Sequence, residues 1–328
     1  MDETTTAPRR ALGTSGLKVS VAALGGNVFG PPRLDQQQTT EVISAALDLG
    51  VDFVDVADVY GQGHAEELLG VALRGRREQM TIATKFNLRA LGEEPVQAYV
   101  RTQAEQSLRR LGSDYIDLYQ LHLPRDGVDM AEVLKALGDL ITEGKVRAIG
   151  ACNFAAWRLA ESAAIARELG VPGFSTVQNY YHVMSRQLEI EVGPYCQRAG
   201  LGILPYHPLA GGFLTGKYRE GSPPPSGSRG ATGSRMVESM LTRDRFETLA
   251  RLTDLAEGAG RSVGQLALAW LADQPGVSAV IAGVSSIDQL RSNVAACAWT
   301  LDASISAAID DLIEPGRVHS PESPPYLP

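Results

Sequence analysis

The sequence predicts an α/β fold, a (β/α)8 TIM barrel preceded by an N-terminal β-hairpin. Eight short apolar runs alternate with stretches of helical periodicity along most of the 328 residues. A strand followed by a helix, repeated eight times, indicates a parallel sheet with helices outside, and the closed form needs about 250 residues. Polar residues end several of the runs, which favours a barrel because such strands carry chemistry at their carboxyl ends. A doubly wound open sheet is the alternative architecture.

The predicted elements follow one another in a regular order. Residues 10–12 and 17–19, joined by Gly13-Thr14-Ser15-Gly16, are typical of a hairpin. Predicted strands lie at residues 21–24, 51–56, 80–84, 115–121, 146–149, 176–178, 202–205 and 279–281. Helical periodicity covers residues 36–49, 65–74, 96–111, 130–143, 155–169, 187–199 and 245–258. Gly50, Gly112 and Gly170 each lie just past such a stretch, where the end of a helix favours positive φ.

The excess over a minimal barrel is assigned to additions around one domain. A further helix is expected at residues 266–272, with Trp270 in the core. Residues 221–233, within a loop around residues 219–235, are rich in Gly, Ser and Pro and are interpreted as a long mobile loop. Because no linker composition separates two halves, residues 1–328 are expected to form a single domain, with a flexible tail at about 315–328.

Composition excludes several classes of function. Hydrophobic residues make up 44% and charged residues 21% of the chain, as in ordinary soluble proteins. The net charge of −8 disfavours nucleic acid as a partner. No apolar run approaches the roughly 18 residues of a membrane span, and the first ten residues lack the apolar stretch of a signal peptide. Cys152, Cys196 and Cys297 form no close-spaced motif, which favours a cytoplasmic location. The oligomeric state is left open.

Four polar residues are expected to meet at one end of the barrel. Asp55, Lys85 and His122 end successive apolar runs, and Tyr60 lies in the loop after Asp55. The ordinary pKa of a phenol, near 10, is high for proton exchange at neutral pH. A lysine ammonium beside Tyr60 favours the phenolate and is expected to lower the pKa of Tyr60, while Asp55 keeps the lysine charged. With His122 to orient a substrate oxygen, the group is predicted to be a tyrosine general acid facing a carbonyl.

A structural explanation exists for each of these residues taken alone. Asp55 could cap a helix, and Tyr60 could form a wall of the core. Neither explanation accounts for Lys85 at the end of the next strand. Polar or small residues end other strands as well, namely Asn153, Gln178, Tyr206 and Gly283. The recurrence favours an active site over a set of solvated strand ends.

The chain resembles the aldo-keto reductase family, in particular the branch that includes potassium-channel β subunits and bacterial aldo/keto reductases. The motif Asp55-Val-Ala-Asp-Val-Tyr60-Gly61, followed by Glu66-Glu67-Leu68-Leu69-Gly70, matches the family's first signature. Later matches are Thr84-Lys85-Phe86, Asp117 to His122, Gly144 to Gly150, and Leu209 to Tyr218. The resemblance implies that Tyr60 is the proton donor, that Asp55 and Lys85 tune it, and that His122 places the carbonyl.

The same resemblance implies NADPH or NADP+ as the cofactor. The positions it assigns to cofactor binding are Gly26, Asn27, Cys152, Asn153, Gln178, Tyr206, His207, Pro208, Leu209, Gly211, Gly212, Lys217, Arg229, Gly283, Ser285, Gln289 and Asn293. By this analogy Asn153 and Gln178 hold the nicotinamide carboxamide, and Tyr206 stacks on the ring. Ser285, Gln289 and Asn293 resemble ligands of the adenosine end. Cys152 stands where the family usually has serine, and a thiol is the weaker hydrogen-bond donor.

Two glycine-rich segments imitate nucleotide motifs without completing them. Gly61-Gln-Gly63-His-Ala-Glu66 ends in a carboxylate, which would repel a pyrophosphate. The segment from Gly211 to Lys217 is followed by Tyr218, which cannot replace the hydroxyl that ligates magnesium in a P-loop. No metal site is expected either, since the five histidines show no ligand spacing.

The sequence therefore predicts an NADPH-dependent enzyme that reduces an aldehyde or ketone to an alcohol. A keto-sugar or another metabolite of a biosynthetic pathway is a narrower form of the same prediction. The alternative is an NADPH-binding sensor or regulatory subunit with little turnover, which the resemblance to channel β subunits suggests. The presence of His122 beside the other three groups favours the enzyme.

Overall fold

Eight parallel strands form one sheet in the computed structural model, which describes residues 6–316. Their order is β10-β3-β4-β5-β6-β7-β8-β9. The bounds are β3 (Ala22–Gly25), β4 (Phe53–Asp55), β5 (Thr81–Phe86), β6 (Ile116–Leu121), β7 (Val146–Cys152), β8 (Thr176–Gln178), β9 (Gly202–Ile203) and β10 (Val280–Ala282). A bridge between Ile203 and Val277, together with a hydrogen bond of 3.2 Å from the N–H of Ile281 to the carbonyl of Pro205, joins the two outer strands. The sheet thereby closes, and the predicted barrel is confirmed.

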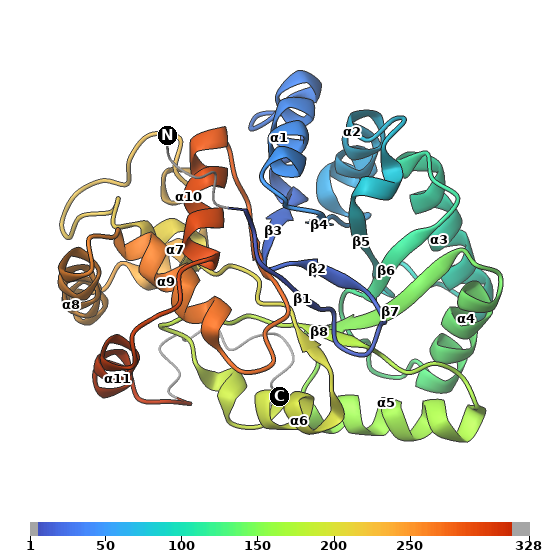
Figure 1. Ribbon diagram of the computed structural model, residues 1–328. Coiled ribbons are helices and arrows are strands. Elements are labelled where there is room, and N and C mark those ends of the chain that lie inside the picture. Colours follow the sequence, from blue (N-terminus) through green and yellow to red (C-terminus); the bar gives the residue numbers. More distant parts are fainter. Residues whose placement is uncertain (1–5, 317–328) are drawn as a thin grey trace.

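Helices surround the sheet, as Figure 1 shows. They are α1 (Gln36–Asp48), α2 (His64–Ala72), α3 (Val96–Leu111), α4 (Met130–Thr142), α5 (Ala156–Leu169), α6 (Val192–Ala199), α7 (Arg235–Met240), α8 (Arg243–Gly258), α9 (Val263–Asp273), α10 (Ile287–Cys297) and α11 (Ala303–Leu312). Asp35 and Ser262 begin α1 and α9 with capping boxes. Trp270 of α9 is buried, as expected. Within residues 6–316 no helix has the length and apolar character needed to cross a membrane.

One predicted helix is wrong. Residues 187–199 do not form a continuous helix but divide into a 3-10 turn, η4 (Gln187–Glu189), and α6. The physical reason is Pro194, the third residue of α6. Proline lacks the N–H that a helix interior needs, so it is tolerated only in a first turn, and the helix begins just before it. The predicted flexible tail extends beyond residue 316 and so lies mostly outside the described residues.

The N-terminal hairpin closes one end of the barrel. Strands β1 (Arg9–Ala11) and β2 (Lys18–Ser20) pair antiparallel and lie across the barrel in Figure 1. Leu12 and Val19 are fully buried against the inward-facing side chains of the strands. Those side chains belong to Ala23, Phe53, Ala83, Leu118, Ala148, Leu204, Ala279 and Ile281. The hairpin covers the amino-terminal ends of the strands. A cavity can therefore open only at their carboxyl ends.

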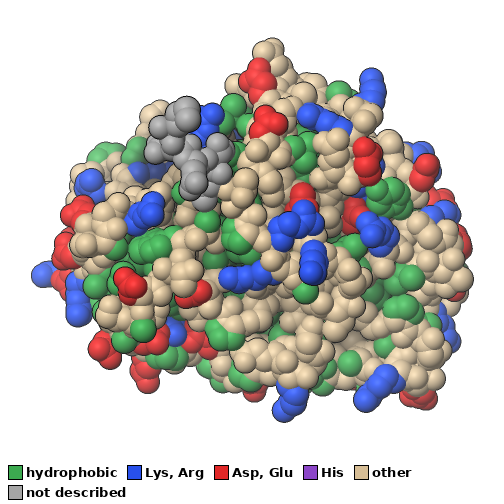
Figure 2. All heavy atoms as spheres, in the orientation of Figure 1, with side chains coloured by type: hydrophobic (Ala, Val, Ile, Leu, Met, Phe, Trp, Pro, Cys, Tyr) green, Lys and Arg blue, Asp and Glu red, His purple; other side chains and the backbone are tan. Residues whose placement is uncertain are grey.

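Ion pairs connect the strand starts on the face around the hairpin. Figure 2 shows basic and acidic side chains interspersed over this face, with hydrophobic side chains in small groups. Arg77 and Arg147 both pair with Asp117 at 2.7 Å, and Arg9 pairs with Asp52. The pairs join neighbouring strand starts, so this end of the barrel stabilises the fold.

We expect Gly13→Ala to destabilise the protein far more than Gly16→Ala. Both glycines have positive φ, which costs an alanine about 1–2 kcal/mol. A Cβ at Gly13 would also lie 1.9 Å from the carbonyl oxygen of Ser175, whereas a Cβ at Gly16 would meet nothing within 4 Å. Urea denaturation should show the larger loss in the free energy of unfolding for Gly13→Ala. Equal losses for the two variants would contradict the close packing of the hairpin against the barrel.

Candidate active site

The inward-facing positions of neighbouring strands place polar side chains above the apolar barrel core. Phe53, Ala83 and Leu118 belong to the core cluster, and the residues two positions later are Asp55, Lys85 and Gln120. Because side chains alternate along a strand, each polar residue faces the same way as the core residue that precedes it by two. The strand register therefore collects polar groups at the carboxyl end of the barrel, where the hairpin leaves room.

Asp55 and Lys85 form a buried ion pair. The Lys85 Nζ donates to Asp55 Oδ2 at 2.6 Å and to the carbonyl of Val56 at 2.8 Å, and its side chain is fully buried. Burial disfavours the ammonium, but attraction to Asp55, with smaller contributions from Tyr60 and Cys152, outweighs it and raises the pKa of Lys85 above its ordinary value. Lys85 is therefore a permanent cation at neutral pH.

Tyr60 lies next to this cation. The Lys85 Nζ is 3.5 Å from the Tyr60 hydroxyl and 5.0 Å from the centre of its ring. Burial raises the pKa of Tyr60 above its ordinary value, and the opposing effect of Lys85 is smaller. Lys85 thus acts in the expected direction, but burial of the phenol outweighs it, so the pKa of Tyr60 is raised overall and not lowered. Tyr60 keeps its proton at neutral pH.

His122 completes the group at the end of β6. Its ring stands edge-on to the ring of Tyr60, with centroids 6.3 Å apart. Burial, followed by the charges of Lys85 and Arg89, lowers the pKa of His122 from 6.5 to about 3. The imidazole is therefore neutral over the physiological range, with one ring nitrogen able to donate a hydrogen bond and the other able to accept one.

A cavity of about 660 Å³ opens beside these residues. Asp55, Tyr60 and His122 line it, whereas Lys85 lies behind them. Fifteen of the positions expected to bind a cofactor also line it: Asn27, Asn153, Gln178, Tyr206, His207, Pro208, Leu209, Gly211, Gly212, Lys217, Arg229, Gly283, Ser285, Gln289 and Asn293. Gly26 and Cys152 are not among the lining residues. Cys152 is fully buried, and its thiol donates to Gln120 Oε1 at 3.7 Å.

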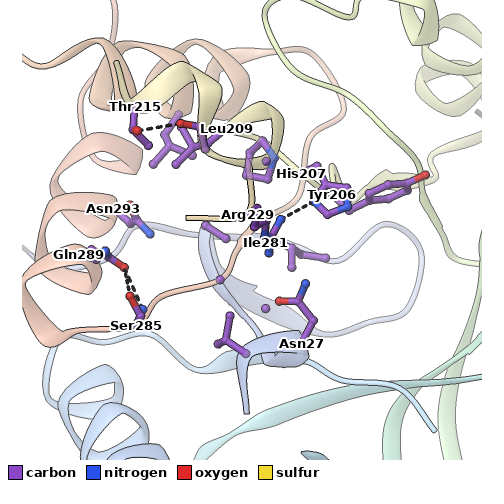
Figure 3. A pocket seen from close by; sticks show the side chains of 18 of the residues that line it. Asn27, Tyr206, His207, Leu209, Thr215, Arg229, Ile281, Ser285, Gln289 and Asn293 are labelled. Carbon is purple, nitrogen blue, oxygen red and sulfur yellow. Dashed lines mark hydrogen bonds between the residues drawn. The ribbon is translucent and has the colours of Figure 1, made fainter. Parts of the chain in front are cut away.

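Hydrogen bonds connect the side chains that line the middle of the cavity. Asn153, at positive φ, donates from Nδ2 to the carbonyl of His122 at 3.0 Å and accepts from the Tyr206 hydroxyl at 2.7 Å. Arg229 donates to His207 Nδ1 at 3.2 Å, a contact visible in Figure 3. Burial and then Arg229 lower the pKa of His207 from 6.5 to about 4, so the ring is neutral and can accept this bond. The hydrogen bond to Asn153 fixes the ring of Tyr206 against one wall of the cavity.

The far end of the cavity is lined by uncharged donors. Ser285, Gln289 and Asn293 gather there in Figure 3, beside the start of α10. Gln289 Oε1 accepts from the Ser285 N–H at 2.9 Å and from its hydroxyl at 3.1 Å. Because the amide oxygen is engaged in this way, the amide of Gln289 presents its nitrogen as a donor.

Gln120 and Arg33 are among the residues of the site that the sequence did not predict. Gln120 is buried on β6 and contacts Asp55, and its inward direction could have been found by counting two residues from Leu118. Arg33, in the loop before α1, lines the cavity close enough to Arg229 for the two charges to oppose each other. A loop arginine carries no periodic signal, so the sequence could not place it. Among residues 6–316 no cluster of three or more His, Cys, Asp and Glu could hold a metal ion.

Comparison with known proteins identifies the family of the chain. Residues 22–314 match the profile of the Aldo/keto reductase family. The chain is 32% identical over 331 residues to "Uncharacterized oxidoreductase YrpG" of Bacillus subtilis (strain 168), covering 95% of this chain and 98% of that protein. It is 32% identical over 316 residues to "Aldo-keto reductase YhdN" of the same organism, covering 93% and 91%. It is also 32% identical over 294 residues to "Probable voltage-gated potassium channel subunit beta" of Arabidopsis thaliana, covering 87% and 89%.

The fold and its relatives together define a (β/α)8-barrel oxidoreductase. The chain belongs to the aldo/keto reductase family. The resemblance noted from its motifs is thereby confirmed.

We expect His122→Gln to flatten the dependence of stability on acidic pH. The imidazole of His122 takes up a proton near pH 6.5 in the unfolded chain but only near pH 3 in the folded chain. Above pH 6.5 the imidazole is neutral in both states, and the free energy of unfolding contains the full contribution of this group. That contribution is lost as the pH falls from 6.5 towards 3, by up to about 1.4 kcal/mol per pH unit. Urea denaturation between pH 7 and 4 measures the slope. Leu123→Ala, at the neighbouring cavity position, should keep the parent slope, and an unchanged slope in His122→Gln would contradict the depressed pKa.

Proposed function

We propose that this protein reduces an aldehyde or ketone to an alcohol with NADPH, and that Tyr60 is the general acid. The observation that carries the proposal is the contiguous set Asp55, Lys85 and Tyr60, joined by contacts of 2.6 and 3.5 Å, at the edge of a large cavity. A buried cation held against a protonated phenol is the arrangement a carbonyl reduction needs, because the phenolate left after proton transfer is stabilised by the adjacent ammonium.

The cavity has the chemistry of a dinucleotide site. Arg33, Lys217 and Arg229 line it, and no carboxylate of the described residues forms an ion pair with any of them. Among residues 6–316, Asp55 is the one carboxylate that lines the cavity, and Lys85 neutralises it. In a chain with a net charge of −8, three cations gathered without counter-ions favour an anionic ligand such as a diphosphate.

The remaining lining residues fit the two ends of NADPH. Near Tyr60, the ring of Tyr206 offers an aromatic face, and the amides of Asn153 and Gln178 could hold a carboxamide. At the far end, Ser285, Gln289 and Asn293 offer hydrogen bonds to the adenosine portion. Gly26 and Cys152 lie outside the lining and would act on the cofactor only through their neighbours.

The reaction balances with one hydride and one proton. NADPH, when bound, would supply the hydride that the carbonyl carbon gains and would itself be oxidised to NADP+. Tyr60 donates its phenolic proton to the carbonyl oxygen as that oxygen gains charge, and a solvent proton later restores it. Neutral His122 donates a hydrogen bond to the same oxygen and orients it. The raised pKa of Tyr60 suits this role, since a general acid must hold its proton until the oxygen becomes basic.

A regulatory role is the second candidate. It is favoured by the potassium-channel β subunits among the relatives, from Arabidopsis thaliana and from Oryza sativa subsp. japonica. The complete set of Asp55, Tyr60, Lys85 and His122 favours turnover instead. A keto-sugar substrate is a narrower form of the first proposal. A cytoplasmic location is also proposed, because all three cysteines are buried free thiols.

We expect Tyr60→Phe to lower turnover by at least about 100-fold, the scale of a missing general acid. NADPH binding, followed by cofactor fluorescence, should stay close to that of the parent because the ring is kept. Stopped-flow oxidation of NADPH with a panel of aldehydes and ketones measures turnover. Tyr195→Phe, on α6 away from the cavity, serves as the matched control and should behave as the parent. Parent-like turnover in Tyr60→Phe would remove the assigned proton donor.

We expect Lys217→Met to weaken NADPH binding by about tenfold, equivalent to about 1.4 kcal/mol. The lost interaction is a charge-assisted contact with phosphate, so the affinity of the variant should also depend less on salt. Fluorescence titration at two salt concentrations measures both effects. Lys135→Met, on the exposed side of α4, removes the same charge far from the cavity and should change neither. An unaltered affinity in Lys217→Met would argue against a phosphate beside this lysine.

A further inference from the structure

Gln120 occupies the floor of the site, beneath the groups that face the cavity. It is fully buried on β6 and does not line the cavity. Its Nε2 donates to Asp55 Oδ1 at 3.1 Å, and its Oε1 accepts from the Cys152 thiol at 3.7 Å. The two contacts select one orientation of the amide, since only the nitrogen can donate to a carboxylate.

The Asp55 carboxylate is held from both sides. Oδ1 accepts from Gln120 and, at 2.8 Å, from Gln178 Nε2, while Oδ2 accepts from Lys85 at 2.6 Å. Three donors on two oxygens leave the carboxylate little freedom to rotate. Lys85 can therefore reach Asp55, the carbonyl of Val56 and the Tyr60 hydroxyl only from one position.

Gly150, on the neighbouring strand β7, lies beside Gln120 and leaves space for its side chain because glycine has no Cβ. A Cβ at Gly150 would lie 2.4 Å from Thr176 Oγ1 and 3.2 Å from Gln120 Cγ. A larger residue there would clash with Thr176 and would also press against the side chain of Gln120. The close approach shows that the side chain of Gln120 packs tightly against β7.

We propose that Gln120 is a positioning residue for the reduction: through Asp55 it holds the Lys85 ammonium against the Tyr60 phenol. The inference rests on the proposed function, because it assigns Gln120 to the proton-transfer step. Gln120 does not line the cavity, so it reaches the Lys85 ammonium and the Tyr60 phenol through its contact with Asp55. Gln178 bonds to the same oxygen but also lines the cavity. Substitution of Gln120 should therefore affect kcat alone, whereas substitution of Gln178 should also affect the KM for NADPH.

The test compares Gln120→Met with Gln178→Met in steady-state NADPH-dependent reduction of one aldehyde. Methionine fills nearly the same volume and removes the amide donor. We expect Gln120→Met to lower kcat by about tenfold with an unchanged KM for NADPH. Gln178→Met should lower kcat and also raise that KM several-fold. Parent-like kcat in Gln120→Met, or a raised KM for NADPH with kcat retained, would overturn the inference.

Gln120→Glu adds a pH signature and covers the case in which the methionine variant does not fold. The introduced carboxylic acid has the shape of glutamine and donates to Asp55 while it is protonated. Once ionised, it becomes a second negative charge beside Asp55 and Cys152, with Lys85 at the paired position of the neighbouring strand. We expect near-parent kcat at acidic pH and a progressive loss as the pH rises, which the parent does not show. A profile parallel to that of the parent would contradict the donor role.

Tyr60→Phe, measured alongside, separates this inference from the function on which it rests. If Tyr60→Phe loses turnover while Gln120→Met and Gln120→Glu behave as the parent, the reduction stands and the role of Gln120 falls. If Tyr60→Phe keeps its turnover, the proposed proton donor falls and the role of Gln120 falls with it. Loss of turnover in Tyr60→Phe, together with the lower kcat of Gln120→Met and the pH dependence of Gln120→Glu, supports both the proton donor and the role of Gln120.

Discussion

The ion pair between Lys85 and Asp55 is the interaction on which the rest of the site depends. Both side chains lie inside the barrel, where a charge without a partner would cost several kcal/mol. The pair is tolerated because each charge has further partners: the carbonyl of Val56 for the ammonium, and the amides of Gln120 and Gln178 for the carboxylate. Removing one member would leave the other uncompensated, at a cost of about 3–5 kcal/mol.

This constraint explains the electrostatics around it. A fixed cation draws the phenol of Tyr60 towards its ionised form, while burial draws it more strongly towards the neutral form. Burial, aided by the same cation, lowers the pKa of His122 and keeps the imidazole neutral. The site therefore combines a permanent charge with two groups that retain their neutral forms at physiological pH. Such an arrangement gives up a proton only when a strongly basic oxygen develops beside it, which is the event in a carbonyl reduction.

The two ends of the barrel have divided roles. The hairpin and the ion pairs around Asp117 close and brace the amino-terminal ends of the strands. The carboxyl ends carry the polar layer and the cavity, with Arg229 reaching in from the long loop after β9. Stability and chemistry thus occupy opposite ends, so the loops around the cavity can vary without weakening the core.

The sequence by itself determined the fold and most of the site. Alternation along the strands and periodicity in the helices predict the barrel, and the polar residues that end successive strands had to converge once the barrel closed. It did not determine the helix at residues 187–199, where Pro194 overrode the periodicity, nor the direction of the Tyr60 pKa, since burial depends on what packs around a loop. The contacts of Gln120 and the approach of Arg33 to Arg229 were likewise decided by the tertiary structure alone. Both depend on distances between segments far apart in the chain, and no local pattern encodes such distances.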